Sequence, residues 1–122
     1  SDYEMEQFLW AVKTGDLPNV QAGVETQGLS AVQADSSVRK ASPLHYAADF
    51  GQVDVATYLI SKGATVDAQD AFGVTPLLAA VYEDHVDMVK FLVSKGANKN
   101  VKGSDGKTAK ESTANPDILA LL

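Results

Sequence analysis

The sequence predicts an all-α solenoid of stacked helix pairs, with two full repeats flanked by two degenerate capping repeats. The first observation is that residues 42–73 recur, 33 residues later, as residues 75–106. The second is one-sided helical spacing of the apolar residues in each copy, and the third is a glycine after each apolar stripe. Residues 1–122 are therefore predicted to form a single repeat domain.

The first helix of each copy has a clear start signal. Ser42 and Thr75 are predicted N-caps, whose hydroxyls accept a hydrogen bond from a free backbone N–H. Pro43 and Pro76 follow at the first helical position, where the missing N–H costs nothing. The run from Ser42 to Ala47, S-P-L-H-Y-A, matches the T-P-L-H-x-A signature of ankyrin repeats except at its first letter. The predicted fold is therefore an ankyrin-repeat solenoid.

The second helix of each copy is marked by an apolar stripe. The stripe residues are Val53, Ala56, Leu59 and Ile60 in one copy and Val86, Val89, Leu92 and Val93 in the other. Gly63 and Gly96 are predicted to end these helices, because glycine adopts the left-handed closing conformation without strain. Gly73 and Gly106 are predicted to serve β-turn loops that project between the repeats.

The chain divides into four units by this register. Residues 4–41 form a degenerate repeat, residues 42–74 and 75–107 the full repeats, and residues 108–122 a truncated repeat. Pro18 is tolerated only in the first turn of its helix. The loop from Leu29 to Ala41 is two residues longer than its counterpart, and we expect it to be the most mobile connection. The last unit has room for two helices only if about three residues are lost near Asn115-Pro116.

Composition and charge exclude several function classes. The chain has no cysteine, which rules out disulfides and thiolate metal sites and fits a reducing cytosol or nucleus. We therefore expect a cytoplasmic monomer, with the nucleus as a second location. No apolar run approaches the roughly 20 residues of a membrane span. A net charge of −6 without a strong basic stripe argues against a nucleic-acid partner.

Gly106-Lys107-Thr108 resembles the end of a phosphate-binding loop, but the residues before it do not fit that motif. Val101 stands where that motif, G-x-x-x-x-G-K-[ST], needs its first glycine, and no buried strand precedes it. The place of the three residues in the repeat explains them as a turn glycine, a loop lysine and a helix cap. The motif therefore does not indicate a nucleotide site.

The histidines and loop acids also have structural explanations. His45 stands where the ankyrin pattern places a histidine that bonds backbone across the turn, and His85 lies in a helix–helix turn, so the two make no metal cluster. Asp67 and Asp70 are expected to bond the local backbone at a loop start. We therefore predict a protein that is not an enzyme and that holds no metal or cofactor.

Several longer runs resemble one family of small ankyrin-repeat proteins, the myotrophins. These runs are residues 8–17, 39–40, 43–49, 75–86 and 101–109, and the resemblance covers nearly the whole chain. It implies a protein that binds heterodimeric actin capping protein, keeps it off filament barbed ends and so regulates actin assembly. An association with Rel-type transcription factors is also ascribed to the family, and a structural scaffold is a third possibility.

The chain departs from the family pattern at three places. Asp84 replaces a glycine at a helix–helix turn, where a left-handed aspartate would cost roughly 1–2 kcal/mol or less. Pro18 is an addition. The loop from Leu29 to Ala41 is longer and lacks the family's glycines before Arg39. These changes are compatible with the fold, and we expect them to affect the affinity for a partner.

The register also names a candidate protein-binding surface, because loops and first helices line the concave side of an ankyrin array. Trp10 and Tyr46 are equally consistent with binding and with filling gaps between repeats. Phe50 and Phe72 fall where arrays normally leave side chains exposed, which favours binding, since aromatic residues and Arg dominate interface hot spots. The predicted surface comprises Trp10, Lys13, Arg39, Tyr46, Asp49, Phe50, Phe72, Val74, Tyr82, Glu83 and Asp105.

Charge is distributed unevenly along the chain. Residues 1–38 carry a net charge of −5, residues 39–87 carry −4 and residues 88–122 carry +3. A partner with a basic face would be steered to the first two-thirds of the chain. Solubility alone also explains a net negative charge. The lysines of the last third, which include Lys95 and Lys99, are interpreted as a solvated edge.

Overall fold

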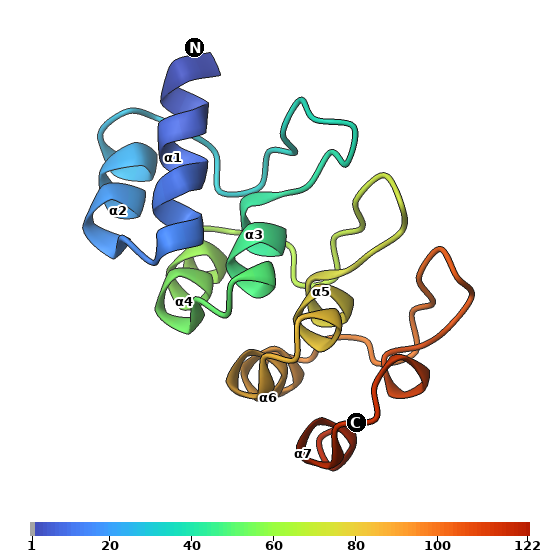
Figure 1. The fold of residues 1–122 in the computed structure, drawn as a ribbon. Coiled ribbons are helices and arrows are strands. Elements are labelled where there is room, and N and C mark those ends of the chain that lie inside the picture. Colours follow the sequence, from blue (N-terminus) through green and yellow to red (C-terminus); the bar gives the residue numbers. More distant parts are fainter. Residues whose placement is uncertain (1) are drawn as a thin grey trace.

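The computed structural model describes residues 2–122, and within this range it is helical without any strand. The helices stack in two layers, and three loops project from the same side of the stack (Figure 1). The layer of first helices contains α1 (Asp2–Thr14), α3 (Pro43–Asp49) and α5 (Pro76–Tyr82). The layer of second helices contains α2 (Leu17–Glu25), α4 (Val53–Ser61), α6 (Val86–Ser94) and α7 (Pro116–Leu119). The predicted ankyrin-repeat solenoid is confirmed.

The helix ends follow the sequence signals. Ser42 caps α3 through a hydrogen bond from the His45 N–H, and the His45 ring bonds the Ser42 N–H in return. Thr75 caps α5 by accepting a hydrogen bond from the Leu78 N–H at 3.2 Å. Pro18 lies in the first turn of α2, as predicted, where no helical hydrogen bond is lost. In the same described range, no helix is long and apolar enough to cross a bilayer.

Small and large apolar residues alternate in the core between the layers. Ala48 and Ala80 have no exposed surface, which lets the two helices of each pair approach closely. The centre of the core is filled by equivalent leucines, each at most 1% exposed: Leu44, Leu59, Leu77 and Leu92. Because neighbouring units share this core, no single unit buries its apolar face alone.

The projecting loops are short hairpins, which we call finger 1 (residues 35–41), finger 2 (residues 70–74) and finger 3 (residues 103–107). A backbone hydrogen bond closes each finger at its base, from Asp35 to Ala41, from Asp70 to Val74 and from Gly103 to Lys107. Finger 1 therefore spans two more residues than the others, so the extra length of this loop lies at its tip. The Ala71 N–H also donates to the Arg39 carbonyl at 2.7 Å, which joins fingers 1 and 2.

The N-cap residue of each of the second helices α4 and α6 bonds a backbone carbonyl of the preceding unit. The N-cap residue Gln52 of α4 donates to the Lys13 carbonyl at 2.9 Å, and the N-cap residue His85 of α6 bonds the Asp49 carbonyl at 2.8 Å. A Cβ on Gly51 would lie 2.8 Å from the His85 ring, so this turn needs a glycine. Asp84 at the equivalent turn is left-handed with φ of 62°, as its position predicted.

One expectation needs correction. Asp67 does not bond its local backbone; its carboxylate accepts a hydrogen bond from the Asn98 N–H at 2.9 Å, because successive loops stack on one another. The last unit contains its two helices in shortened form, the 3-10 helix η1 (Lys110–Ser112) and α7, with Thr113 extended between them. Because α4 begins at residue 53 and α6 at residue 86, the register would start α7 at residue 119; it starts at Pro116, so the expected loss of about three residues is confirmed. The expected mobility of the long loop stays a prediction.

Candidate protein-binding face

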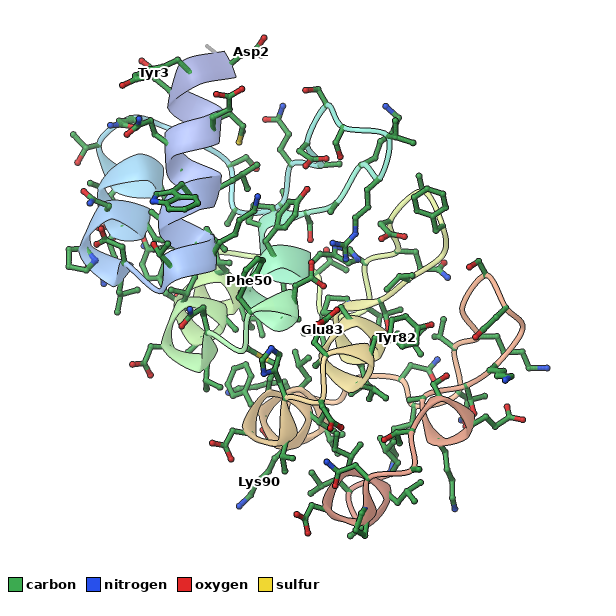
Figure 2. The ribbon with its side chains drawn as sticks, viewed as in Figure 1. Asp2, Tyr3, Phe50, Tyr82, Glu83 and Lys90 are labelled. Atoms are coloured by element: carbon green, nitrogen blue, oxygen red, sulfur yellow. The ribbon has the colours of Figure 1, made fainter. Side chains whose placement is uncertain are left out.

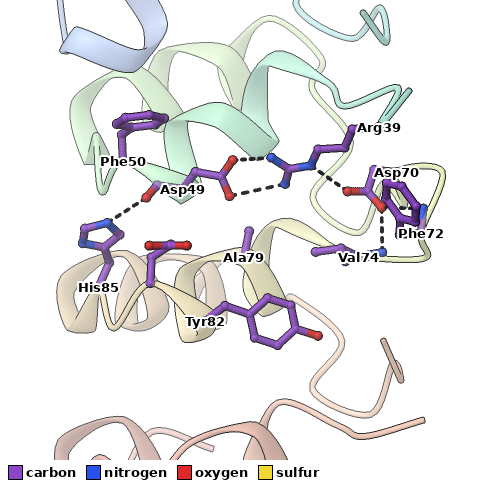
Figure 3. Close-up of a pocket in the computed structure, with 10 residues that line it drawn as sticks. Arg39, Asp49, Phe50, Asp70, Phe72, Val74, Ala79, Tyr82 and His85 are labelled. Carbon is purple, nitrogen blue, oxygen red and sulfur yellow. Dashed lines mark hydrogen bonds and ion pairs between the residues drawn. The ribbon is translucent and has the colours of Figure 1, made fainter. Parts of the chain in front are cut away.

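The predicted surface residues gather around two depressions on the side of the first helices and fingers. The larger one, the central pocket, has a volume of about 710 Å³ and lies between α3, α5 and fingers 1 and 2 (Figure 3). Arg39, Asp49, Phe50, Phe72, Val74, Tyr82 and Glu83 line it, with Asp70, Ala79 and His85. The smaller one, the N-terminal pocket, has a volume of about 440 Å³ and is lined by Trp10, Lys13, Tyr46 and Asp35 among others.

Arg39 forms the polar centre of the central pocket. Its Nε donates to Asp70 at 2.8 Å, while both terminal nitrogens donate to the two carboxylate oxygens of Asp49. Figure 3 shows the guanidinium group held between the two carboxylates. Because all three nitrogens are engaged, Arg39 ties finger 1 to finger 2 and to the end of α3. The pKa of Arg39 is raised; burial alone would lower it, and the two carboxylates outweigh that effect.

Asp70 holds the base of finger 2 as well as Arg39. One carboxylate oxygen accepts hydrogen bonds from the Phe72 N–H at 2.9 Å and the Val74 N–H at 3.0 Å. Its side chain is only 1% exposed. Burial by itself raises the pKa of this carboxyl, but the hydrogen bonds from Arg39, Val74 and Phe72 lower it more, so the net pKa is below its usual value.

Tyr46 lines the N-terminal pocket and lies next to Arg39 of the central pocket. The Lys13 ammonium lies 4.6 Å from the centre of its ring and the Arg39 guanidinium carbon 5.5 Å from it, and its hydroxyl donates to Asp35. Burial and then the Asp35 bond raise the pKa of Tyr46. Tyr46 therefore links α1 and finger 1, and its role in partner binding stays a prediction.

Four aromatic side chains of this face are exposed. Trp10 is 69% exposed, Phe50 51%, Phe72 50% and Tyr82 42%. Trp10 therefore fills no gap between repeats. Phe50 directly follows α3, Tyr82 is the last residue of the neighbouring first helix α5, and Glu83 follows Tyr82 (Figure 2). Aromatic surface left in water on one side of a protein typically marks an interaction site.

The Tyr82 hydroxyl lies close to finger 3. A Cβ added to Gly103 would lie 2.4 Å from the Tyr82 hydroxyl, so a larger residue at position 103 would displace the end of this side chain. Burial raises the pKa of Tyr82, and the nearby carboxylates of Asp105 and Asp70 raise it further. Asp105 lines neither pocket and acts on this face through its charge.

The central pocket carries an excess of negative charge. Three carboxylates line it, those of Asp49, Asp70 and Glu83, against one guanidinium group, that of Arg39. Glu83 is exposed, and its carboxylate makes no hydrogen bond or ion pair with the residues that the structure describes, 2–122. Nor does the described part of the chain bring three His, Cys, Asp or Glu side chains together as metal ligands. This arrangement suits recognition of a cation by aromatic rings and carboxylates.

Asp35, Asp70, Ala79 and His85 are among the residues of this face that sequence reasoning missed. Asp35 carried no signal, because the two extra residues at the tip of finger 1 shift it out of register with Asp70. Asp70 was recognised as a loop residue, but not as the partner of Arg39. His85 and Ala79 line the central pocket because α5 and the turn after it lie against α3. The Asp49 carbonyl fixes the His85 ring at the edge of the pocket.

Comparison with known proteins places relatives along nearly the whole chain. Residues 8–103 match the ankyrin-repeat family, described as "Ankyrin repeats (3 copies)". The chain is similar to myotrophin of Xenopus tropicalis, with 49% identity over 117 residues that cover 96% of this chain and 97% of that protein. Myotrophins of Rattus norvegicus and Homo sapiens are each 50% identical over 117 residues, with the same coverage.

Proposed function

Because this chain belongs to the myotrophin family of ankyrin-repeat proteins, we propose that it sequesters heterodimeric actin capping protein and thereby regulates barbed-end actin assembly. Ankyrin-repeat proteins of this family are protein-interaction modules and not enzymes. The resemblance to the family supports the identity of the partner, and the acidic, aromatic face supports the kind of surface that the partner presents. We further propose that the protein acts in the cytoplasm.

The observation that carries the proposal is the set of exposed aromatic rings around an acidic pocket. Phe50, Phe72 and Tyr82 surround the Arg39 ion pairs and the free carboxylate of Glu83. Aromatic anchors lose little conformational entropy when they are buried in an interface. Ion pairs that hold neighbouring fingers together fix the face before binding, which reduces the ordering cost of association. A basic partner surface therefore meets a face that is already in its binding shape.

The uneven distribution of charge along the chain also supports electrostatic attraction of a basic partner to this face. The net charge of −6 is concentrated in the first two-thirds of the chain, where both pockets lie. A basic surface is attracted to this region and repelled by the lysine-rich last third. By covering the basic surface of free capping protein, the module would prevent that surface from reaching the filament end.

An elongation assay tests this function. Pyrene-labelled actin is elongated from barbed-end seeds in the presence of capping protein, with increasing concentrations of the wild-type chain. We expect the wild type to restore elongation, and a Lys95→Glu/Lys99→Glu variant to do so equally well, because these lysines lie away from both pockets.

If the wild type leaves capping unchanged at micromolar concentrations, capping-protein sequestration is wrong. The regulator of a Rel-type transcription factor then becomes the next function to test with the same face. If only the lysine variant fails, the function stands and the binding face is misplaced.

A further inference from the structure

We propose that the central pocket is an anchor site for one arginine side chain of the protein partner. The inference rests on the proposed function only in that a protein partner covers this face. It adds the chemical identity of the group that enters the pocket and the residues that select it.

The first argument is the shape of the pocket. Its volume of about 710 Å³ falls within the range of roughly 300–1,000 Å³ of pockets that enclose small organic groups. Phe50 and Phe72 leave half of their surface in water, and the Tyr82 hydroxyl lies close to Gly103 of finger 3. Arg39, which is bound to both Asp49 and Asp70, links the walls of the pocket.

The second argument is the distribution of charge within it. Both oxygens of Asp49 accept from Arg39, and the oxygens of Asp70 are occupied by Arg39, Phe72 and Val74. The charge of Arg39 is thereby more than balanced. Glu83 is left as the pocket's free carboxylate within the described chain, and it is exposed to solvent. A cation that enters is attracted by the excess negative charge and finds one carboxylate to pair with.

The third argument selects arginine over lysine. A lysine ammonium is strongly hydrated, so it needs several carboxylates or carbonyls to replace its water. A guanidinium group is planar and weakly hydrated, stacks on aromatic rings and pairs with a single carboxylate through two parallel N–H groups. The molecule already contains this arrangement, since Arg39 lies over the Tyr46 ring and binds Asp49 with two nitrogens. The pocket offers aromatic rings and one free carboxylate to a second guanidinium.

Small probes test the site without any partner protein. N-acetyl-arginine methylamide is titrated into the labelled wild-type chain and followed by NMR, with N-acetyl-citrulline methylamide as a neutral probe of the same shape. We expect the arginine probe to shift the Phe50, Phe72 and Tyr82 ring signals with a Kd of about 1 mM, near the weak end for specific ligands. The citrulline probe should bind at least about tenfold more weakly, because it carries no charge.

Substitutions assign the effect to named residues. Glu83→Gln and Phe50→Ala should each weaken binding of the arginine probe about threefold, since each removes an exposed contact of modest strength. Asp87→Asn removes an equal charge from the exposed side of α6, and Tyr3→Ala removes an aromatic ring that is 69% exposed and outside both pockets. Both control variants should bind as the wild type does.

The outcomes separate this inference from the proposed function. Equal shifts with arginine and citrulline, shifts spread over the whole surface, or wild-type affinity in Glu83→Gln and Phe50→Ala would each overturn the arginine site. N-acetyl-lysine methylamide is titrated in the same way, and binding of this probe that is tighter than that of the arginine probe would overturn the selection of arginine. None of these results depends on capping protein. Conversely, a failed elongation assay combined with specific arginine binding would leave the site intact and reject only the named partner.

Discussion

Asn115 donates a hydrogen bond from Nδ2 to the Asp84 carboxylate at 3.1 Å, and this bond joins the truncated last unit to the repeat before it. Asn115 is the N-cap residue of α7, as Gln52 is of α4 and His85 is of α6, and all three side chains reach back to the preceding helix–helix turn. In the earlier turns a glycine leaves room for that side chain. In the last turn Asp84 supplies a hydrogen-bond acceptor instead, which gives its departure from the family pattern a structural role.

A double-mutant cycle tests this role of Asp84. Asn115→Asp keeps an oxygen that caps α7 through the Asp117 N–H, but it replaces the amide donor with a second carboxylate facing Asp84. In the wild-type background we expect a loss of about 1–2 kcal/mol, from the lost hydrogen bond and the like-charge repulsion. In an Asp84→Gly background the same change should cost less than about 0.5 kcal/mol. Urea denaturation provides the free energies, and equal losses in the two backgrounds would refute the coupling.

The Arg39 ion pairs predict a second stability effect. Arg39→Met leaves the Asp70 carboxylate, with its side chain 1% exposed, without a counter-charge and should cost about 3 kcal/mol. Adding Asp70→Asn removes the stranded charge while keeping an oxygen for the Phe72 and Val74 N–H groups. The double variant should therefore recover at least half of the loss in denaturant titrations. A loss below about 1 kcal/mol in the single variant would mean that the ion pairs do not hold the fingers together.

The repeat register predicts the effect of truncating the core. Leu59 and Leu92 have no exposed surface, so Leu59→Ala or Leu92→Ala should each cost about 2–5 kcal/mol. Ile60, next to Leu59, is only partly buried and serves as the control, with a smaller loss expected for Ile60→Ala. Denaturant unfolding measures all three variants. A cost below about 1 kcal/mol at either leucine is incompatible with the predicted register.

His45 predicts how stability depends on pH near neutrality. Burial lowers the pKa of His45 below its ordinary value of 6.5, although the bond from its Nε2 to the Val74 carbonyl partly opposes the shift. Below pH 6.5 the unfolded chain therefore binds a proton at His45 more readily than the folded chain does. The contribution of His45 to the free energy of unfolding is full above pH 6.5 and falls as the pH decreases. His45→Gln should be less stable but should lack this slope. If the free energy of unfolding falls equally in the wild type and in His45→Gln between neutral and mildly acidic pH, His45 is not the cause of the pH dependence.

Asp35 and Asp70 predict a further loss in more acidic solution. Hydrogen bonds lower the pKa of both carboxyls below the ordinary value of 3.8, even though burial acts in the opposite direction. Their contribution to stability is present above that value and is lost as the pH falls through the lower folded-state pKa values. Asp35→Asn should flatten the acid limb of a pH titration of unfolding. An acid limb unchanged by this substitution would rule out Asp35 as a source.

The fold could be predicted from sequence because the same helix-start and helix-end signals occur in both full repeats. A cap at Ser42 and Thr75, a proline after each and a glycine at each helix end are local features that act within a few residues. The exposed positions of Phe50 and Phe72 follow from the same register, since equivalent positions point the same way in each unit.

The rest of the face depends on contacts between units, which a repeat pattern does not specify. Arg39 finds its partners in Asp49 and Asp70, which are 10 and 31 residues away in sequence. The two extra residues in finger 1 put Asp35 out of register with Asp70, so the repeat pattern does not predict its role. The shortening of the last unit likewise puts Asn115 out of register with His85.

The direct test of the central claim is the equilibrium affinity of purified capping protein for variants of this one face. The wild type, Phe50→Ala, Phe72→Ala, Trp10→Ala and the Lys95→Glu/Lys99→Glu variant are compared by calorimetry at low and high salt. We predict that at least one aromatic variant loses about 2 kcal/mol or more of binding free energy while keeping its unfolding free energy. The lysine variant should bind as tightly as the wild type, and wild-type binding should weaken as salt rises. Wild-type affinity in all three aromatic variants, or binding that is insensitive to salt, would contradict the claim that this acidic, aromatic face binds the partner.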